Sequence, residues 1–333
     1  MTASTTASPT PAPETATVSH PMHSGERTWT ETNCYADVWI ELLHDLGLDP
    51  VPAFVSALSA DFQGDQWVFL KVEAEDLRDL YGITVGEMNV WRDVRDHVIE
   101  QLDMGRRTTV EVDSWWLPDT AGVSYRLEHV KTTIVPTAVD VEGRTMRYLH
   151  SAGQHTLSGE DFDHVFDLRV GVDGPSLPPY MEVVRLDRLE DPADLPARTA
   201  ELARRHVRRR PDDNPVDRLS ARLVADMPWL REQGLETFHR YAFGMIRQCG
   251  VTAELAADVV EWLTTHGQAD LTDAAASFRA ASASAKTLQF RVARAVSGRD
   301  VDIDALVRPV AEAWGAAMAD VVAWAETSAY GPA

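Results

Sequence analysis

Cys34 is the residue of this chain best suited, by its type and position, to covalent chemistry. Apolar residues recur at helical spacing over residues 35–46 and Gly47 ends the pattern, so a helix is expected to begin beside Cys34. Thr32 or Asn33 is a suitable N-cap for this helix. Unpaired N–H groups and the positive end of the helix dipole favour a nucleophilic thiolate there. The alternative is that Cys34 is a small buried hydrophobic residue.

A histidine that could serve this cysteine follows on a later predicted strand. Residues 129–135 are predicted to form a strand that begins at His129, and residues 145–150 to form the strand that returns after a tight turn. If the two strands pair about that turn, residues 151–155 come back alongside His129. We therefore expect His129 to lie among polar side chains.

The elements that must position these residues are short helices and strands in the first part of the chain. There we expect further helices at 53–60, 74–81, 85–102 and 160–168, strands at 64–72, 109–113 and 181–186, and an aromatic loop at 114–120. Later periodic segments all indicate helices, at 197–207, 216–233, 237–249, 253–266, 271–296 and 303–327. Their short connections are typical of a helical bundle.

These elements suggest two domains and a tail. Residues 1–29 are rich in Thr, Ala and Pro, and we expect them to be disordered. Residues 30–190 are expected to form an α+β domain, and residues 197–333 an all-α domain. The segment between them, 190–196, is rich in proline and acidic residues, as is typical of a domain boundary.

Bulk composition limits the partners and the compartment. The 333 residues carry a formal net charge of −21, which disfavours nucleic acid and anionic membranes as main partners. No apolar run approaches the roughly 20 residues that span a bilayer, and the first 29 residues lack the basic start and apolar segment of a secretory signal. Two distant cysteines, Cys34 and Cys249, suit a reducing compartment, so we expect a cytoplasmic protein with a structural Cys249.

One basic run interrupts the acidic sequence. It contains Arg204, Arg205, Arg208, Arg209 and Arg210. We interpret it either as a solvated helix face or as a docking surface for an acidic partner or a phosphate group.

A second group of candidate residues lies after the returning strand. It contains His150, His155, Asp161, Asp163 and His164, which is enough donors for a metal ion. Their spacing fits no compact metal-binding motif such as His-Glu-x-x-His. We therefore expect structural roles for them and no bound metal.

A helix-start cysteine followed by a histidine on a later strand resembles the arrangement of papain-like cysteine enzymes. In that chemistry the thiolate attacks a carbonyl carbon, and the imidazole holds and then delivers the proton. A third polar group orients the imidazole, and N–H groups at the helix start stabilise the oxyanion. The fold class implied is a papain-like α+β domain followed by an all-α domain.

The sequence also resembles two particular families. The motif VDSWWLP at 112–118 and the segment EHVKTTIV at 128–135 resemble the amino-terminal region of butirosin biosynthesis protein H type acyltransferases, over about residues 30–155. From residue 30 onward, with TNCYADVWIE at 32–41, GDQW at 64–67 and NVW at 89–91, the chain resembles the bacterial family known as domain of unknown function 1839.

The resemblances imply acyl transfer in natural-product biosynthesis. Cys34 would be the nucleophile and His129 the general base and acid. The acyl or aminoacyl group would come from the phosphopantetheine thioester of a carrier protein, with no bound cofactor, and would pass to a small-molecule amine. A non-catalytic partner of a carrier protein or ligase, and a thioester hydrolase of the same fold, are the alternatives.

The third catalytic residue is left open by these resemblances. The related enzymes tend to place an aspartate where the returning strand of this chain ends in His150. His150 is the first choice for the residue that orients His129, and Asp113 and Asp119 compete with it. The remaining substrate-site candidates are Asn33, for the oxyanion, and Lys131.

Overall fold

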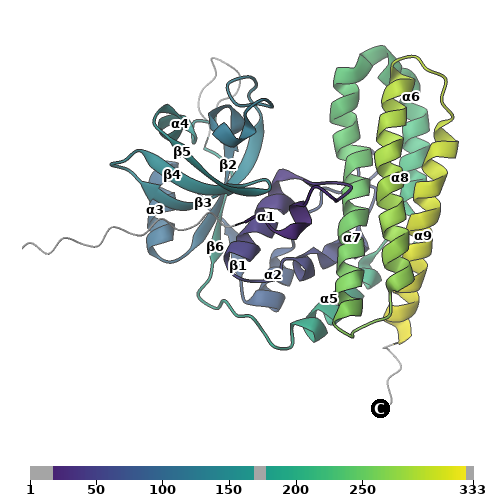
Figure 1. Cartoon of the computed structure of the whole chain (residues 1–333), viewed down its shortest axis with the longest axis horizontal. Helices are drawn as coiled ribbons and strands as arrows, with labels where there is room; N and C mark the ends of the chain where they lie inside the picture. The colour runs from purple at the N-terminus through teal and green to yellow at the C-terminus, as the bar shows by residue number, and fades with distance from the viewer. Residues whose placement is uncertain (1–17, 169–177, 328–333) are drawn as a thin grey trace, which may run out of the picture.

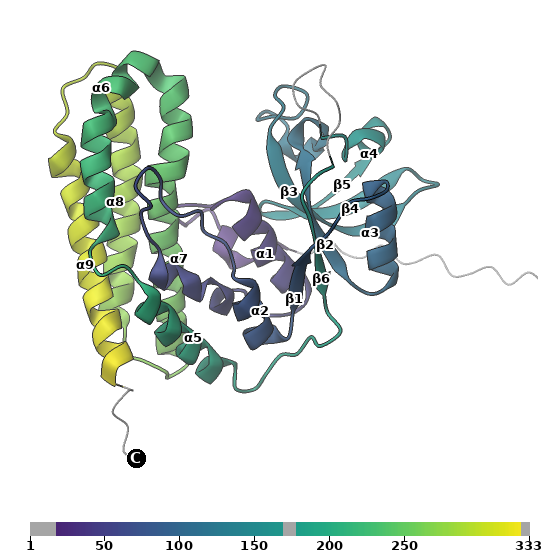
Figure 2. The ribbon, with the colours of Figure 1, turned by 180° about the vertical axis from the view of Figure 1, so that it is seen from behind.

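The computed structural model describes residues 18–168 and 178–327, which form a mixed α+β protein. A six-stranded antiparallel sheet lies at one end of the molecule and a bundle of long helices at the other (Figure 1). The helices α1 (Cys34–Asp45) and α2 (Ala74–Tyr81) lie between them, as both views show (Figure 2). The expected helix at Cys34 is thereby confirmed.

The sheet has the strand order β1-β6-β2-β3-β4-β5. The strands are β1 (Thr84–Glu87), β2 (Arg107–Asp113), β3 (Lys131–Asp140), β4 (Thr145–His150), β5 (Gly153–Ser158) and β6 (Met181–Arg185). The strands predicted at 109–113, 129–135, 145–150 and 181–186 are therefore present, although the third of the six begins at Lys131 and leaves His129 outside it. The chain after β4 turns directly into β5, so residues 153–155 pair with β4 and not with His129.

The two faces of the sheet belong to different cores, because successive side chains of a strand point in opposite directions. Val135 of β3 and its partner Leu149 of β4 join the larger core, which includes α1. Ile134 and Tyr148, one residue earlier on each strand, join a smaller core with α3 (Val94–Asp103) and α4 (Glu160–His164). The cysteine helix thus covers one face of β3 and β4.

The second half of the described chain is helical. The elements are α5 (Leu195–Arg209), α6 (Pro215–Ala242), the π-helical turn η5 (Phe243–Arg247), α7 (Gln248–Thr265), α8 (Thr272–Val296) and α9 (Ile303–Thr327). The helix end expected after residue 233 falls at Gly234, whose φ of 81° interrupts α6. The break expected at 250–252 is wrong, because α7 continues through Gly250, which lies against the Trp29 ring.

The larger core crosses the expected domain boundary. It joins α1, α2 and the 3-10 segment η2 (Val51–Ser59) to the helices α5–α9. Residues 190–196 do lead into α5, but the helices before this segment share one apolar core with the helices after it. None of the described helices is long and apolar enough to cross a membrane.

The tail is shorter than the sequence predicts. Trp29 is buried, and its Nε1 donates a hydrogen bond to Ser282 Oγ at 3.1 Å. The backbone N–H groups of Thr28 and Trp29 each donate to Glu254 at 3.0 Å. The expectation of disorder is therefore wrong for residues 18–29, because contacts with distant helices hold them. Residues 1–17 lie outside the described residues.

Three local predictions in the first half also need correction. Residues 64–72 form no strand, and only a bridge between Phe62 and Trp67 is present, because the Trp67 N–H donates to the Gly244 carbonyl. The helix expected at 85–102 is split, since its start pairs with β6 as β1 and α3 begins at Val94. The segment expected at 53–60 is the 3-10 segment η2.

Candidate functional site

Cys34 is the first residue of α1, and Asn33 holds the backbone around it. The Asn33 side-chain oxygen accepts hydrogen bonds from the N–H groups of Tyr35 and Ala36 at 3.1 and 2.9 Å, which confirms Asn33 as the N-cap. Its amide nitrogen donates to the Leu70 carbonyl at 3.0 Å. Because both ends of the Asn33 amide are engaged in this way, its role is to cap α1 and not to bind an oxyanion.

The Cys34 side chain opens into a cavity of about 500 Å³. The cavity wall comes from the start of α1, from the connection between β2 and β3, from the β4–β5 turn and from η5. Cys34 Sγ lies 3.8 Å from Thr133 Oγ1. Of the candidates from the sequence, the cavity wall includes Asn33, Cys34, Asp119, Lys131 and His150.

His150, the last residue of β4, forms a buried pair with Asp119 on this wall. His150 Nδ1 lies 2.5 Å from Asp119 Oδ2, and Nε2 lies 2.8 Å from Thr132 Oγ1. Since a carboxylate only accepts hydrogen bonds, Nδ1 carries the proton of the neutral ring, and Nε2 accepts from the Thr132 hydroxyl. Nε2 is therefore the basic atom of this pair.

Asp119 is held in its ionised form by its neighbours. Burial raises the pKa of Asp119, but the hydrogen bond and electrostatic interaction with His150 and a hydrogen bond from Tyr148 outweigh it, so the pKa lies below its ordinary value. A buried carboxylate on Nδ1 fixes both the tautomer and the orientation of the imidazole. Asp119 is therefore the residue that orients the His150 ring.

His129 forms a second histidine–aspartate pair outside the cavity. Its Nδ1 lies 2.6 Å from Asp113 Oδ2, and its ring stacks on Trp115 at 4.5 Å between ring centroids. The His129 side chain is 45% exposed, whereas that of His150 is 5% exposed. Asp113 is the aspartate that orients His129, so the predicted His129–His150 relationship is replaced by two separate pairs.

Strand β3 separates the sulfur from the imidazole. Thr132, which contacts His150, and Thr133, which contacts Cys34, are successive residues and so point to opposite faces of the sheet. His150 and Cys34 reach the same cavity from these two faces.

A buried charged cluster lies directly behind the first turn of α1. His23 Nδ1 lies 2.6 Å from Glu41 Oε1, and its Nε2 lies 3.3 Å from Asp37 Oδ1. Asp37 also accepts hydrogen bonds from the Thr32 N–H and hydroxyl. Burial lowers the pKa of His23, but hydrogen bonds and charges of the two carboxylates outweigh this and raise it to about 9. The cluster fastens the segment before Cys34 to the helix that carries it.

Several residues of the site could not be identified from sequence. Asp37 is on the cavity wall, and so are Phe243 and Arg247 of η5, which come from the second half of the chain. The buried hydroxyl of Ser114 also lines it and has no hydrogen-bond partner among the residues that the structure describes. Only the position of Asp37 within the first turn after Cys34 gave a local signal; the others depend on tertiary contacts.

Lys131 lies at the mouth of the cavity. Its ammonium group forms an ion pair of 2.5 Å with Glu111 of β2, and its side chain is largely exposed. The cation therefore already has a carboxylate partner at the site.

The basic run lies on α5 and at its end, away from the cavity wall. Arg205 pairs with Asp76 at 2.5 Å and with Asp79 at 3.1 Å, and Arg209 pairs with Glu73 at 3.3 Å. These three carboxylates bind α5 to α2. Of the other members, Arg204 lies over the Trp324 ring and Arg210 donates to the Val207 carbonyl. Arg208 is exposed.

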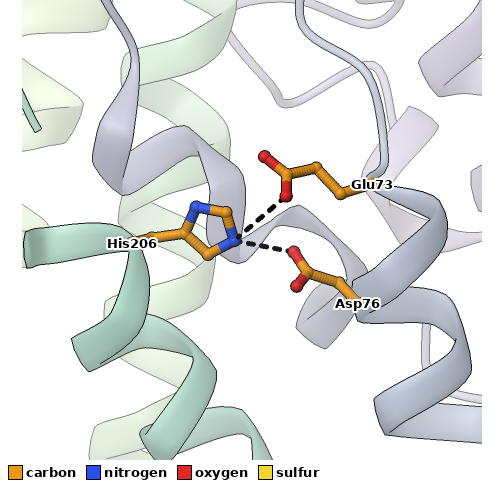
Figure 3. Close-up of side chains that lie close together, drawn as sticks. All are labelled: Glu73, Asp76 and His206. Atoms are coloured by element: carbon orange, nitrogen blue, oxygen red, sulfur yellow. Dashed lines mark hydrogen bonds and ion pairs between the residues drawn. The ribbon is translucent and has the colours of Figure 1, made fainter. Parts of the chain in front are cut away.

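The same contact contains a compact group of metal-ligand residues, Glu73, Asp76 and His206 (Figure 3). His206 Nε2 lies 2.7 Å from Asp76 and 3.9 Å from Glu73, while Nδ1 contacts Ser59 Oγ at 2.9 Å. Arg205 and Arg209 already neutralise these two carboxylates. The group therefore has the character of a buried ion-pair network that joins α2 to α5.

Of the polar residues predicted as a possible metal group, His150 and His155 both lie near Asp119 on the cavity wall, at 2.5 and 3.9 Å, and the other three have separate partners. Asp161 accepts from Tyr125 and Arg126, Asp163 pairs with Arg144, and His164 pairs with Asp167. His155 Nε2 lies 3.3 Å from the His150 carbonyl. Cys249 is fully buried, and burial raises the pKa of its thiol far above the ordinary value.

Fold and site together define an α+β protein with a cysteine-containing cavity formed by both halves of the chain. Residues 18–186 match the family model described as the DUF1839 N-terminal domain, and residues 192–323 match that of the DUF1839 C-terminal domain. The chain belongs to the DUF1839 family. No curated protein matches it.

Proposed function

We propose that this protein is a cysteine-dependent acyltransferase in which Cys34 carries the acyl group. The observation that supports this is the shared cavity: a helix-start cysteine and a buried His150–Asp119 pair line one space of about 500 Å³. Cys34 stands at the start of α1, and the aspartate holds the imidazole in the tautomer whose Nε2, hydrogen-bonded to the Thr132 hydroxyl, can accept a proton. In this proposal His150 replaces His129 as general base and acid.

The proposed reaction has two steps. Cys34 Sγ attacks the carbonyl carbon of a thioester donor, its proton passes through water to His150 Nε2, and the departing thiolate takes that proton as the carbon–sulfur bond of the donor breaks. An amine then attacks the Cys34 thioester, and its proton returns through His150 to the cysteine sulfur. The backbone N–H of Cys34, at the first helical position, is the proposed donor to the oxyanion.

The papain-like fold and the carrier-protein donor are finer parts of the same proposal. They rest on the resemblance of residues 30–155 to butirosin-type acyltransferases and imply a phosphopantetheine thioester as donor and an amine as acceptor. In the basic run, Arg205 and Arg209 are occupied by acidic residues of α2. A carrier protein would therefore contact chiefly Arg208 and Arg210, together with the accessible part of the Arg204 side chain.

The test is intact-mass spectrometry after incubation with an acyl carrier protein and with a small acyl thioester. Wild-type protein should gain the mass of the acyl group, and Cys34→Ala should not. His150→Ala should acylate far more slowly, while His129→Ala is the matched control, since it removes a histidine from the other aspartate pair. Full loss in His129→Ala with an active His150→Ala would reverse the assignment of the base.

The alternative is a binding protein that performs no chemistry. It is favoured by one observation: both ring nitrogens of His150 are already hydrogen-bonded, and the sulfur contacts Thr133. If no adduct forms with either donor and the donor thioester decays at the same rate with every variant, this alternative replaces the acyltransferase. An adduct that forms and is released by water without any amine would indicate a hydrolase.

A further inference from the structure

Arg247 is a partly buried cation on the wall of the Cys34 cavity. Its Nη2 donates to the Glu31 carbonyl at 2.7 Å, and its Nε donates to the Thr32 carbonyl at 3.3 Å. Both acceptors are neutral backbone groups, and within residues 18–168 and 178–327 no carboxylate forms an ion pair with Arg247. A guanidinium has five N–H donors, so donors remain for a ligand.

In lacking an ion pair among the described residues, Arg247 resembles Arg95 and Arg204 and differs from two partly buried arginines that hold carboxylates. Arg27 pairs with Asp258 at 2.7 Å, and Arg205 pairs with Asp76 at 2.5 Å, in a chain with 52 acidic and 31 basic residues. Removing a charge from water is unfavourable unless a partner compensates it. Burial lowers the pKa of Arg247 accordingly, and the nearby charges of Asp37 and Glu31 oppose this effect.

A second cation, Lys286, lies near the same tryptophan ring as Arg247. Lys286 Nζ of α8 lies 4.0 Å from the ring centroid of Trp29, and Arg247 Cζ lies 5.4 Å from the ring centroid of the same residue. Burial, and after it the positive charge of Arg247, lower the pKa of Lys286. Two cations that repel each other across one tryptophan form a positive region on an otherwise acidic protein.

The surroundings of Arg247 are suited to an anion with an apolar part. Three carboxylates line the same cavity. Asp37 is compensated by His23, which is protonated at neutral pH because its pKa is raised to about 9. Asp119 pairs with His150, and Glu31 is exposed. Phe243 lies four residues before Arg247, with its ring 5.9 Å from Arg247 Cζ. Phe243, Val123 and Val130 are exposed apolar side chains on the cavity wall.

We propose that Arg247, backed by Lys286, binds a carboxylate or phosphate group on the molecule that enters the Cys34 cavity, and that Phe243, Val123 and Val130 contact its apolar part. The inference rests on the proposed function in one respect, the choice of acyl thioesters as ligands. It makes the second half of the chain the part that selects the substrate for a cysteine in the first half.

The test measures binding in Cys34→Ala, which cannot turn over. Three thioesters are compared by isothermal titration calorimetry. Butyryl-N-acetylcysteamine is neutral, glutaryl-N-acetylcysteamine carries a carboxylate on the acyl half, and butyryl-phosphopantetheine carries a phosphate on the thiol half. At least one anionic ligand should bind about tenfold more tightly than the neutral one, as a charge-assisted hydrogen bond provides. The better anionic ligand identifies the source of the charge.

Two variants in the Cys34→Ala background locate the anion site. Arg247→Gln should remove the tenfold preference and leave the Kd of the neutral thioester unchanged. Lys286→Gln, which alters no backbone hydrogen bond, should weaken anion binding by about threefold through charge alone. Arg240→Gln, which alters an exposed arginine of α6 outside the cavity, should have no effect.

Equal affinity for all three thioesters would overturn the anion site, and so would an anion preference that survives in both Arg247→Gln and Lys286→Gln. The proposed function fails separately, because it depends on an acyl adduct of wild-type Cys34. Selective anion binding to Cys34→Ala without any adduct on wild type would leave this inference standing and the acyltransferase refuted.

Discussion

His150 Nδ1 lies 2.5 Å from Asp119 Oδ2, and both side chains are buried on the wall of the cavity that contains Cys34. A similar pair, His129 and Asp113, lies outside that wall with an exposed imidazole. The protein therefore contains its own matched control for the role of a histidine–aspartate pair beside the cysteine.

Asp119→Asn should abolish the basic tautomer of His150. An asparagine amide that donates to Nδ1 moves the ring proton to Nε2, so the ring no longer accepts a proton there. The single-turnover rate of Cys34 acylation should fall about 100-fold or more. Asp113→Asn, the control, should leave that rate within about twofold, since it alters only the exposed pair. Equal losses in the two variants would show that Asp119 does not act through the cavity.

Asn33→Ala should destabilise the protein and change the reactivity of the Cys34 thiol. Loss of the N-cap leaves two N–H groups of α1 unpaired, which lowers the free energy of unfolding by about 1 kcal/mol. Urea unfolding measures this change, and the pH profile of Cys34 alkylation by iodoacetamide measures the effect on the thiol. Asp93→Ala removes the N-cap of α3 and should cost a similar amount of stability without moving the alkylation profile. Identical alkylation profiles in both variants would show that Asn33 has no effect on the reactivity of the Cys34 thiol.

His23 should make stability fall at alkaline pH. Its pKa is raised from 6.5 to about 9 by Asp37 and Glu41, which outweigh burial. Because the folded-state pKa is the higher one, the stabilisation is complete below pH 6.5 and is lost as pH rises through about 9. The free energy of unfolding of wild type, relative to His23→Gln, should fall by on the order of 3 kcal/mol between pH 6 and pH 10. Parallel curves for the two proteins would contradict the buried cluster.

Gly250→Ala should release the segment before Cys34. A Cβ at this position would lie 2.7 Å from the Trp29 ring, so the tryptophan or α7 must move. The expected loss is about 1–3 kcal/mol of stability, with faster proteolysis within residues 18–29. Gly244→Ala is the control, since its Cβ would meet nothing within 4 Å. Unchanged proteolysis in Gly250→Ala would show that Trp29 does not fasten this segment.

The sequence by itself determined the elements whose side-chain period is local. The helix at Cys34 and the strands that became β2, β3, β4 and β6 were predictable, because periods of 3.6 and 2 are set by backbone geometry. The sequence narrowed the N-cap to Thr32 or Asn33, and the structure decided for Asn33. The sequence also identified both histidines and both aspartates of the two pairs. The strand predicted at residues 64–72 is wrong, because alternating apolar residues do not reveal whether a partner strand exists. Here the Trp67 N–H donates a hydrogen bond to the Gly244 carbonyl.

Only the tertiary structure decided which pair lines the cavity that contains Cys34. His150 ends β4 and His129 lies two residues before β3, and the choice between them depends on contacts that are distant in the sequence. The same holds for Trp29, which composition placed in a tail and which Glu254 and Ser282 hold in the core. Arg247 has no local signal at all, because only the tertiary structure shows that it lines the cavity and that no carboxylate among the described residues forms an ion pair with it.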